Sequence, residues 1–259
     1  MLVAVMWTDV VDLRDFYVSS LGQVARRMIR RRLRALWPDV TGQNVLGLGY
    51  ATPYLNGFRG EAQRVLAAMP AAQGVLHWPL DESGLTTLVD ERDLPFSDLS
   101  MDRVLLIHAV ECAEQLRPMM REVWRVLSGS GRLLVVVPNR RGIWARFERT
   151  PFGHGLPYTT GQLSRVLRDN LFTPVDSYRA LFVPPVHSRM VLSAAPAWEQ
   201  VGQRLFTTFS GVVMMEAVKQ IYAAGAVPAR ERRRGYLPVA ERTPRVSHRR
   251  SPPAPPATS

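Results

Sequence analysis

Short apolar runs alternate along this chain with segments in which apolar residues recur at helical spacing. The first such segment extends from about Asp15 to Trp37 and is predicted to be a helix that ends at Pro38. A second helix is predicted over residues 53–69, where Phe58, Val65, Leu66 and Met69 share one face. Strands are predicted at 44–48, 74–78, 85–89, 102–108, 132–138, 172–183 and 211–219.

Two more helices complete the alternation. One is predicted from Arg117 to Leu127 and is followed by a turn with the sequence SGSG. The other begins with a capping box, because Thr159 can cap the helix and Gln162 stands three residues later. Seven strands alternating with helices predict an α/β fold with a doubly wound, largely parallel sheet.

Positive charge is concentrated in two segments of a chain whose net charge is +11. Six arginines and no acid lie between Gly22 and Trp37, and residues 228–259 carry eight arginines against two glutamates. The rest of the chain is therefore close to neutral. The basic helix and the basic tail are either solvated surface or faces for an anionic partner.

Composition narrows the class of protein further. The 259 residues are 46% hydrophobic, which suits one sizeable domain or two small ones. Cys112 is the single cysteine, so no internal disulfide is expected and a cytoplasmic location is predicted. No run of about 18 apolar residues predicts an integral membrane segment, and no Cys/His spacing predicts a metal site.

Four short motifs carry a resemblance to a known family. Asp93–Phe96 reads DLPF, Met101–Asp102 follows, 121–127 reads REVWRVL, and 129–131 reads GSG. In this order and approximate spacing they resemble the class I S-adenosylmethionine-dependent methyltransferases of type 11, over about Gln43 to Asn139. The resemblance implies a Rossmann-like seven-stranded sheet whose last strand is antiparallel. It also implies S-adenosyl-L-methionine as cofactor at the carboxyl ends of the first strands.

With this resemblance the chain divides into three expected parts. Residues 1–40 form an N-terminal basic helical segment, and 41–222 form the methyltransferase-like domain. Residues 223–259, rich in Arg and Pro, are expected to be disordered because they hold few large apolar residues.

The loop after the first strand departs from the family pattern of one acid followed by three alternating glycines. Gly47 stands where the acid is expected, Gly49 keeps the first glycine, and Ala51 and Pro53 replace the other two. The backbone can still form a cofactor shelf, because Ala51 adds only a methyl group and proline is tolerated in the first turn of a helix. The resemblance therefore implies cofactor contacts from Gly47, Gly49, Tyr50 and Ala51.

Further cofactor contacts are implied after the next three strands. Trp78 or Asp81, after the strand predicted at 74–78, would meet adenine or the ribose hydroxyls. Asp90 would accept a hydrogen bond from the adenine amino group, beside Glu91. His108 would lie in the wall under the cofactor.

The predicted function is methyl transfer to an unidentified small-molecule acceptor. His154 is the candidate general base, since imidazole titrates near neutrality, and Tyr158 is a candidate pocket residue. The alternative is a catalytically inactive methyltransferase fold that serves as a binding or accessory protein. Nucleic-acid binding is not favoured, because no base-reading module is recognisable.

Overall fold

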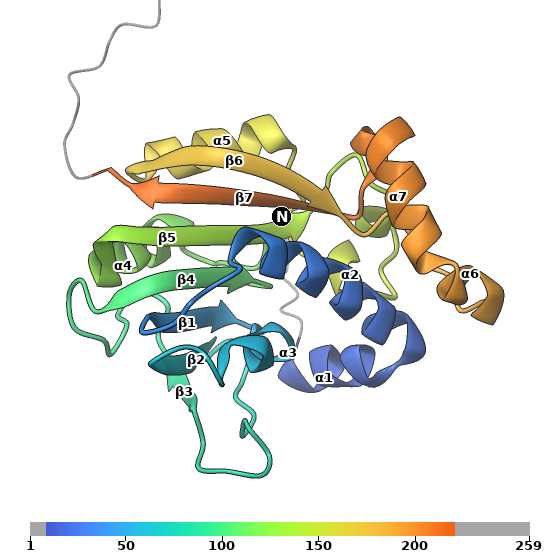
Figure 1. The fold of residues 1–259 in the computed structure, drawn as a ribbon. Helices are drawn as coiled ribbons and strands as arrows, with labels where there is room; N and C mark the ends of the chain where they lie inside the picture. Colours follow the sequence, from blue (N-terminus) through green and yellow to red (C-terminus); the bar gives the residue numbers. More distant parts are fainter. Residues whose placement is uncertain (1–8, 221–259) are drawn as a thin grey trace, which may run out of the picture. The chain divides into compact units, whose positions relative to one another are not determined.

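Seven strands form one mixed sheet within residues 9–220, the part of the chain that this computed structural model describes. Their order across the sheet is β3-β2-β1-β4-β5-β7-β6 (Figure 1). The strands are β1 (Asn44–Gly49), β2 (Arg64–Pro70), β3 (Thr86–Val89), β4 (Met101–Ile107), β5 (Leu127–Pro138), β6 (Phe172–Ala180) and β7 (Val212–Lys219).

Strand directions confirm the predicted fold class. Strands β1 to β5 pair in parallel, so their carboxyl ends meet at one side of the sheet, here called the carboxyl edge. Strand β7 runs antiparallel to both β5 and β6. The last strand is thus reversed, as the family resemblance implies.

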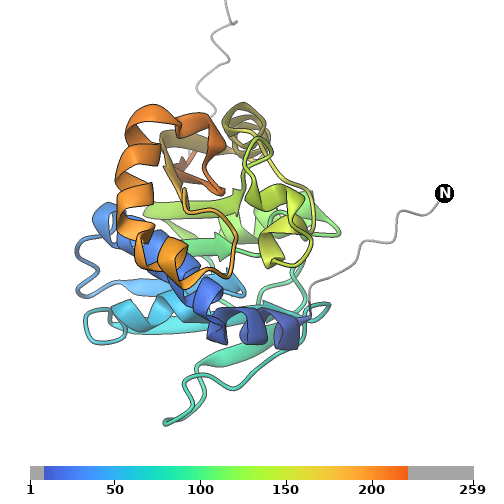
Figure 2. The same ribbon diagram turned by 90° about the vertical axis from the view of Figure 1, so that its right-hand side faces the viewer.

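Helices cover both faces of the sheet (Figures 1 and 2). The helices are α1 (Val10–Val18), α2 (Ser20–Leu36), α3 (Thr52–Leu55), α4 (Leu116–Val126), α5 (Thr160–Asp169), α6 (Arg189–Ser193) and α7 (Ala195–Leu205). Helices α1, α2, α3, α6 and α7 share one hydrophobic cluster with the sheet, whereas α4 and α5 share the other. Alternate residues of β5, such as Leu133 and Leu134, point to opposite clusters because side chains alternate across a strand.

The single N-terminal helix predicted from Asp15 to Trp37 is wrong in its start and its continuity. Two helices form, and Ser19 separates them. The Ser19 hydroxyl donates to the carbonyl of Phe16 and accepts the N–H of Gly22, so one residue ends α1 and caps α2.

The helix predicted over 53–69 and the strand predicted over 74–78 are also wrong. Only 52–58 is helical, as α3 and the 3-10 turn η1 (Asn56–Phe58). Residues 64–70 form β2 instead, where Ala67 and Ala68 are fully buried against β1 and β3. A short apolar run fits both the helical and the strand period. Here the run forms a strand because it pairs with two neighbouring strands, β1 and β3. Residues 74–78 follow as irregular backbone.

The last two strands and the helix before them agree with the sequence. The capping box is confirmed, with Gln162 N–H bonded to the Thr159 hydroxyl and Thr159 N–H bonded to the Gln162 side chain. The predicted SGSG turn is wrong, because 128–131 lie inside β5, whose register against β4 shifts there.

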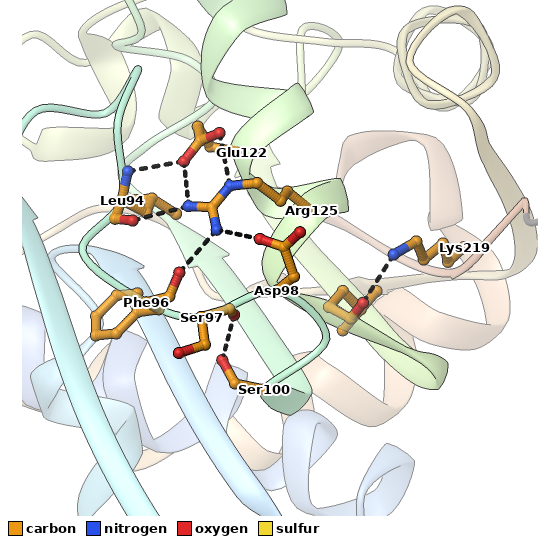
Figure 3. A network of polar contacts seen from close by, with 9 residues as sticks. Leu94, Phe96, Ser97, Asp98, Ser100, Glu122, Arg125 and Lys219 are labelled. Atoms are coloured by element: carbon orange, nitrogen blue, oxygen red, sulfur yellow. Dashed lines mark hydrogen bonds and ion pairs between the residues drawn. The ribbon is translucent and has the colours of Figure 1, made fainter.

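The family motifs DLPF and REVWRVL form a structural clamp (Figure 3). Arg125 of α4 donates to the carbonyls of Leu94 and Phe96 and pairs with Asp98 and Glu122. Glu122 in turn accepts the N–H of Leu94 at 2.8 Å. These residues fix the loop before β4 onto α4. The motifs that carry the family resemblance therefore have a structural role here.

Replacing Arg125 by Ala is expected to lower the free energy of unfolding by about 2 kcal/mol, because bonds to a charged group are lost and Glu122 loses its partner. Chemical denaturation would measure this. Arg121→Ala is the matched control, since Arg121 is exposed on the same helix; its effect should stay within about 0.5 kcal/mol. Equal losses in the two variants would contradict the clamp.

Two further expectations concern the tail and membrane-spanning segments. The predicted tail, 223–259, lies outside residues 9–220. Within the described part, no helix has the length and apolar character needed to cross a bilayer.

Candidate functional site

At the end of β1, where the cofactor loop begins, the backbone packs directly against the end of β4. Gly49 has a φ of +87°, and a Cβ there would lie 2.4 Å from the carbonyl oxygen of Ile107. Only glycine tolerates both this positive φ and this close approach of the Ile107 carbonyl. Tyr50 and Ala51 are buried, at 6% and 0% exposure. Packing against β4 therefore already accounts for the glycine that the sequence shares with the family.

Gly47 has no room for the acid that the family places there. A Cβ on Gly47 would lie 2.5 Å from the Ala51 Cβ and 2.8 Å from a methyl group of Leu55. The side chains of Ala51, just before α3, and Leu55, at its end, thus occupy the volume that a carboxylate would need. The packing of this loop therefore leaves no space for an acidic side chain at residue 47.

Tyr17 of α1 covers the shelf, a contact that sequence reasoning missed. Its ring stacks on Tyr50 with centroids 5.8 Å apart and planes 24° apart. Its hydroxyl lies 2.9 Å from the Tyr54 hydroxyl and 2.8 Å from His108 Nε2. Burial raises the pKa of Tyr17 well above its ordinary value, so the phenol stays neutral. No local sequence signal marks Tyr17, because its partners are far away along the chain.

His108 and Glu111 continue this polar network below Tyr17. His108 is 1% exposed and has a φ of +52°, a conformation that a side chain other than glycine rarely takes. Its Nδ1 lies 3.4 Å from Glu111 Oε1. The second carboxylate oxygen of Glu111 is buried and has no hydrogen-bond partner within residues 9–220. Tyr17, His108 and Glu111 thus form a buried relay at the carboxyl end of β4.

Gln73 completes the cover over Gly49. Its side-chain amide donates to the His108 carbonyl, and its backbone carbonyl accepts the N–H of Val10 at 2.8 Å. Gln73 follows β2 and is only 2% exposed. It therefore ties the end of β2 to the end of β4 and to the start of α1.

A pocket of about 220 Å³ opens beside this cover, at the carboxyl ends of β2 and β3. Its lining consists of Pro70, Ala71, Ala72, Val89, Asp90, Glu91, Arg92, Glu114 and Gln115. Hydrogen bonds from the side chain and the backbone N–H of Arg92 lower the pKa of Asp90 to about 2, so this carboxylate is ionised at neutral pH. Burial raises the pKa of Glu91, which also accepts the N–H of Gln115.

Trp78 and Asp81 do not directly follow a strand, because β2 ends at Pro70 and the strand predicted at 74–78 is wrong. Ala71 and Ala72 stand after β2 instead, and neither can bind ribose hydroxyls through its side chain. Trp78 lies in the loop between β2 and β3, with the Arg59 guanidinium 5.7 Å from its ring. Asp81 is exposed in the same loop.

The predicted base His154 lies in the loop before α5. This loop crosses the end of β4, because the N–H of Leu156 bonds to the Glu111 carbonyl at 2.8 Å. His154 itself is half-buried, and its Nε2 lies 2.6 Å from the Glu148 carbonyl. Tyr158 is partly buried, with its pKa raised by burial. His154 thus has a backbone partner and remains an untested candidate.

The carboxyl edge has a pocket at the ends of β2 and β3 and is tightly packed around Gly49. The pocket offers the carboxyl oxygens of Asp90 and Glu91 at the place where the family resemblance implies the adenosyl group. At the end of β1, where the amino-acid half is implied, Tyr17 stacks on Tyr50 and Gln73 donates to the His108 carbonyl.

Residues 47–135 match the family model described as "Methyltransferase domain". No curated protein sequence matches the chain. The matched segment begins at the cofactor loop and ends inside β5, so it contains the shelf, the pocket and the clamp.

Solved structures share the fold at low sequence identity. A S-adenosylmethionine-dependent methyltransferase from Thermotoga maritima superimposes with a TM-score of 0.58 at 15% identity, covering 81% of this chain and 96% of that one. A methyltransferase from Haloferax volcanii, in complex with the Trm112 activator, gives 0.56 at 17% identity, covering 81% and 98%. The [4+2]-cyclase SpnF gives 0.53 at 18% identity, covering 78% and 84%.

Sheet topology, reversed last strand and carboxyl-edge site define a Rossmann-like methyltransferase fold. Residues 47–135 match the methyltransferase family model, and residues 9–220 share the fold of the class I S-adenosylmethionine-dependent methyltransferases.

Proposed function

We propose that the protein transfers a methyl group from S-adenosylmethionine to a small-molecule acceptor, and that α1 covers the cofactor site when the cofactor is absent. The pocket bordered by Asp90 and Glu91 carries this proposal, because it lies where parallel α/β sheets bind ligands. The cofactor supplies the methyl group when bound, and the protein supplies position and exclusion of water. The single cysteine leads us to infer a cytoplasmic location.

Asp90 is proposed to hold the adenosyl end. Its carboxylate is ionised and already oriented by Arg92, so binding requires little reorganisation of this group. On the other side of Gly49, we propose that His108 accepts a hydrogen bond or a proton from the acceptor once Tyr17 has moved. Glu111 beside Nδ1 would orient the imidazole. His154 stays a second candidate for this role.

One observation favours a second function, a fold that binds without catalysing. The site lacks both acids by which the family pattern holds the cofactor, at Gly47 and after β2, and Gly47 leaves no volume for one. The cyclase among the structural neighbours illustrates that this fold also serves other activities.

Calorimetric titration with S-adenosylhomocysteine separates the two functions. The methyltransferase proposal expects binding, weakened about tenfold by Asp90→Asn because a hydrogen bond to a charged group is lost. Asp93→Asn is the control, since Asp93 is an exposed acid three residues away that does not line the pocket. Absence of heat in the wild type at high ligand concentration would support the non-catalytic alternative.

A further inference from the structure

Two long connections form one continuous layer at the carboxyl edge. Residues 139–158 leave the end of β5, and 181–211 join β6 to β7 at the same edge, since Pro138 and Ala180 both pair with Val212. The Asn139 amide donates to the Ser210 carbonyl at 2.9 Å, and the Trp144 indole donates to the Val183 carbonyl at 2.8 Å. We call residues 139–158 and 181–211 the edge layer; Figure 2 faces it.

The edge layer exposes many large apolar side chains. They are Met190 (81% exposed), Leu205 (72%), Leu156 (68%), Phe209 (56%), Phe206 (54%), Val201 (44%), Ile143 (44%), Trp198 (41%), Phe147 (40%) and Val186 (38%). Within α7, Trp198, Val201 and Leu205 recur at helical spacing and so form one stripe. Apolar exposure on this scale marks an interaction surface.

The charges of the edge layer are almost all positive. Its arginines are all exposed, and none has an ion pair within the described chain: Arg140, Arg141, Arg146, Arg149, Arg189 and Arg204. The layer holds two acids. Glu148 is exposed, whereas Glu199 is buried and accepts the N–H groups of Leu181 and Phe182.

Helix α2 extends this cationic surface. Arg31 and Arg32 line a groove with Gln200 and Gln203 of α7, so the two helices adjoin. Further along α2, Arg26, Arg27, Arg30, Arg31 and Arg34 line another hollow of about 400 Å³, and of these Arg34 is ion-paired with Glu61. Arginines spaced three and four residues apart repel one another, which an anionic partner would relieve.

We propose that the edge layer binds the surface of an anionic phospholipid bilayer. Exposed Met, Leu, Val, Trp and Phe side chains enter the interfacial region, and the arginines contact headgroup phosphates. A second copy of the chain fits less well, because it would bring the same uncompensated arginines to the interface. Nucleic acid fits less well too, because it offers no apolar phase to aliphatic side chains. This proposal does not depend on the proposed methyl transfer.

Vesicle co-sedimentation of the full chain tests it. We expect binding to phosphatidylcholine vesicles that contain phosphatidylglycerol, and little to phosphatidylcholine alone. Leu205→Asp with Phe209→Asp should weaken binding at least about tenfold through lost apolar burial. Arg189→Gln and Arg204→Gln should each weaken it about fivefold. Leu171→Asp is the control, since Leu171 is 54% exposed at the opposite edge, before β6.

Thermal unfolding would show that each variant folds. Failure of the wild type to bind anionic vesicles, or equal binding by wild type and the Leu205/Phe209 double variant, would overturn the proposal. Analytical ultracentrifugation tests whether a second copy of the chain binds the edge layer instead. A wild-type dimer that the double variant converts to monomer would assign the layer to a second copy and also overturn it.

Discussion

Replacing Gly47 by Asp, which restores the family's acid, is expected to lower the free energy of unfolding by about 4 kcal/mol or more. The new Cβ would overlap the Ala51 side chain, and the carboxylate would be buried against Leu55 without a partner. We therefore expect less folded protein and no gain in cofactor binding. Chemical denaturation and titration with S-adenosylhomocysteine would measure both.

Gly47→Ala separates the two causes, overlap and buried charge. It adds the same Cβ without the carboxylate, so its loss should be smaller, about 1–3 kcal/mol. A Gly47→Asp variant that is as stable as the wild type and binds ligand more tightly would contradict the packing described for this loop.

Replacing Tyr17 by Ala is expected to uncover the shelf, and to tighten S-adenosylhomocysteine binding about tenfold. A ligand that must first displace Tyr17 binds with reduced apparent affinity, and the variant removes that cost. The variant should also lose about 3–4 kcal/mol of stability, because a buried aromatic ring is deleted. Calorimetric titration and chemical denaturation would measure the two effects.

Tyr17→Phe is the matched control for this variant. It keeps the ring stacked on Tyr50 but removes the hydroxyl that bonds Tyr54 and His108. Its affinity should lie between those of the wild type and Tyr17→Ala. Unchanged affinity in a folded Tyr17→Ala variant would mean that Tyr17 does not cover the ligand site.

The sheet could be predicted largely because its central strands are covered on both faces. Continuous apolar runs such as 102–108 and 132–138 have few other interpretations. Strand β2 could not be placed in the same way, since RVLAAMP also fits a helix and only its pairing with β1 and β3 decides the matter. That error moved the end of the second strand from Pro70 to Trp78, and with it the expected ribose contacts.

The site was predictable only where it follows the chain locally. Asp90 and Glu91 come directly after a correctly predicted strand, and the structure places both at the pocket. Tyr17 and Gln73 were missed because their contacts join residues up to 91 positions apart, as between Tyr17 and His108. Such contacts arise from the packing of α1 onto the carboxyl edge, and no spacing in the sequence encodes them.

The central claim is that an adenosyl ligand occupies the pocket beside Asp90 and that its far end takes the place of Tyr17 above Gly49. A crystal structure determined in an excess of S-adenosylhomocysteine tests it most directly. We predict adenine in the pocket of β2 and β3, sulfur above Gly49, and Tyr17 separated from His108. Tyr17 still stacked on Tyr50 and bonded to His108, with the pocket empty, would contradict the account.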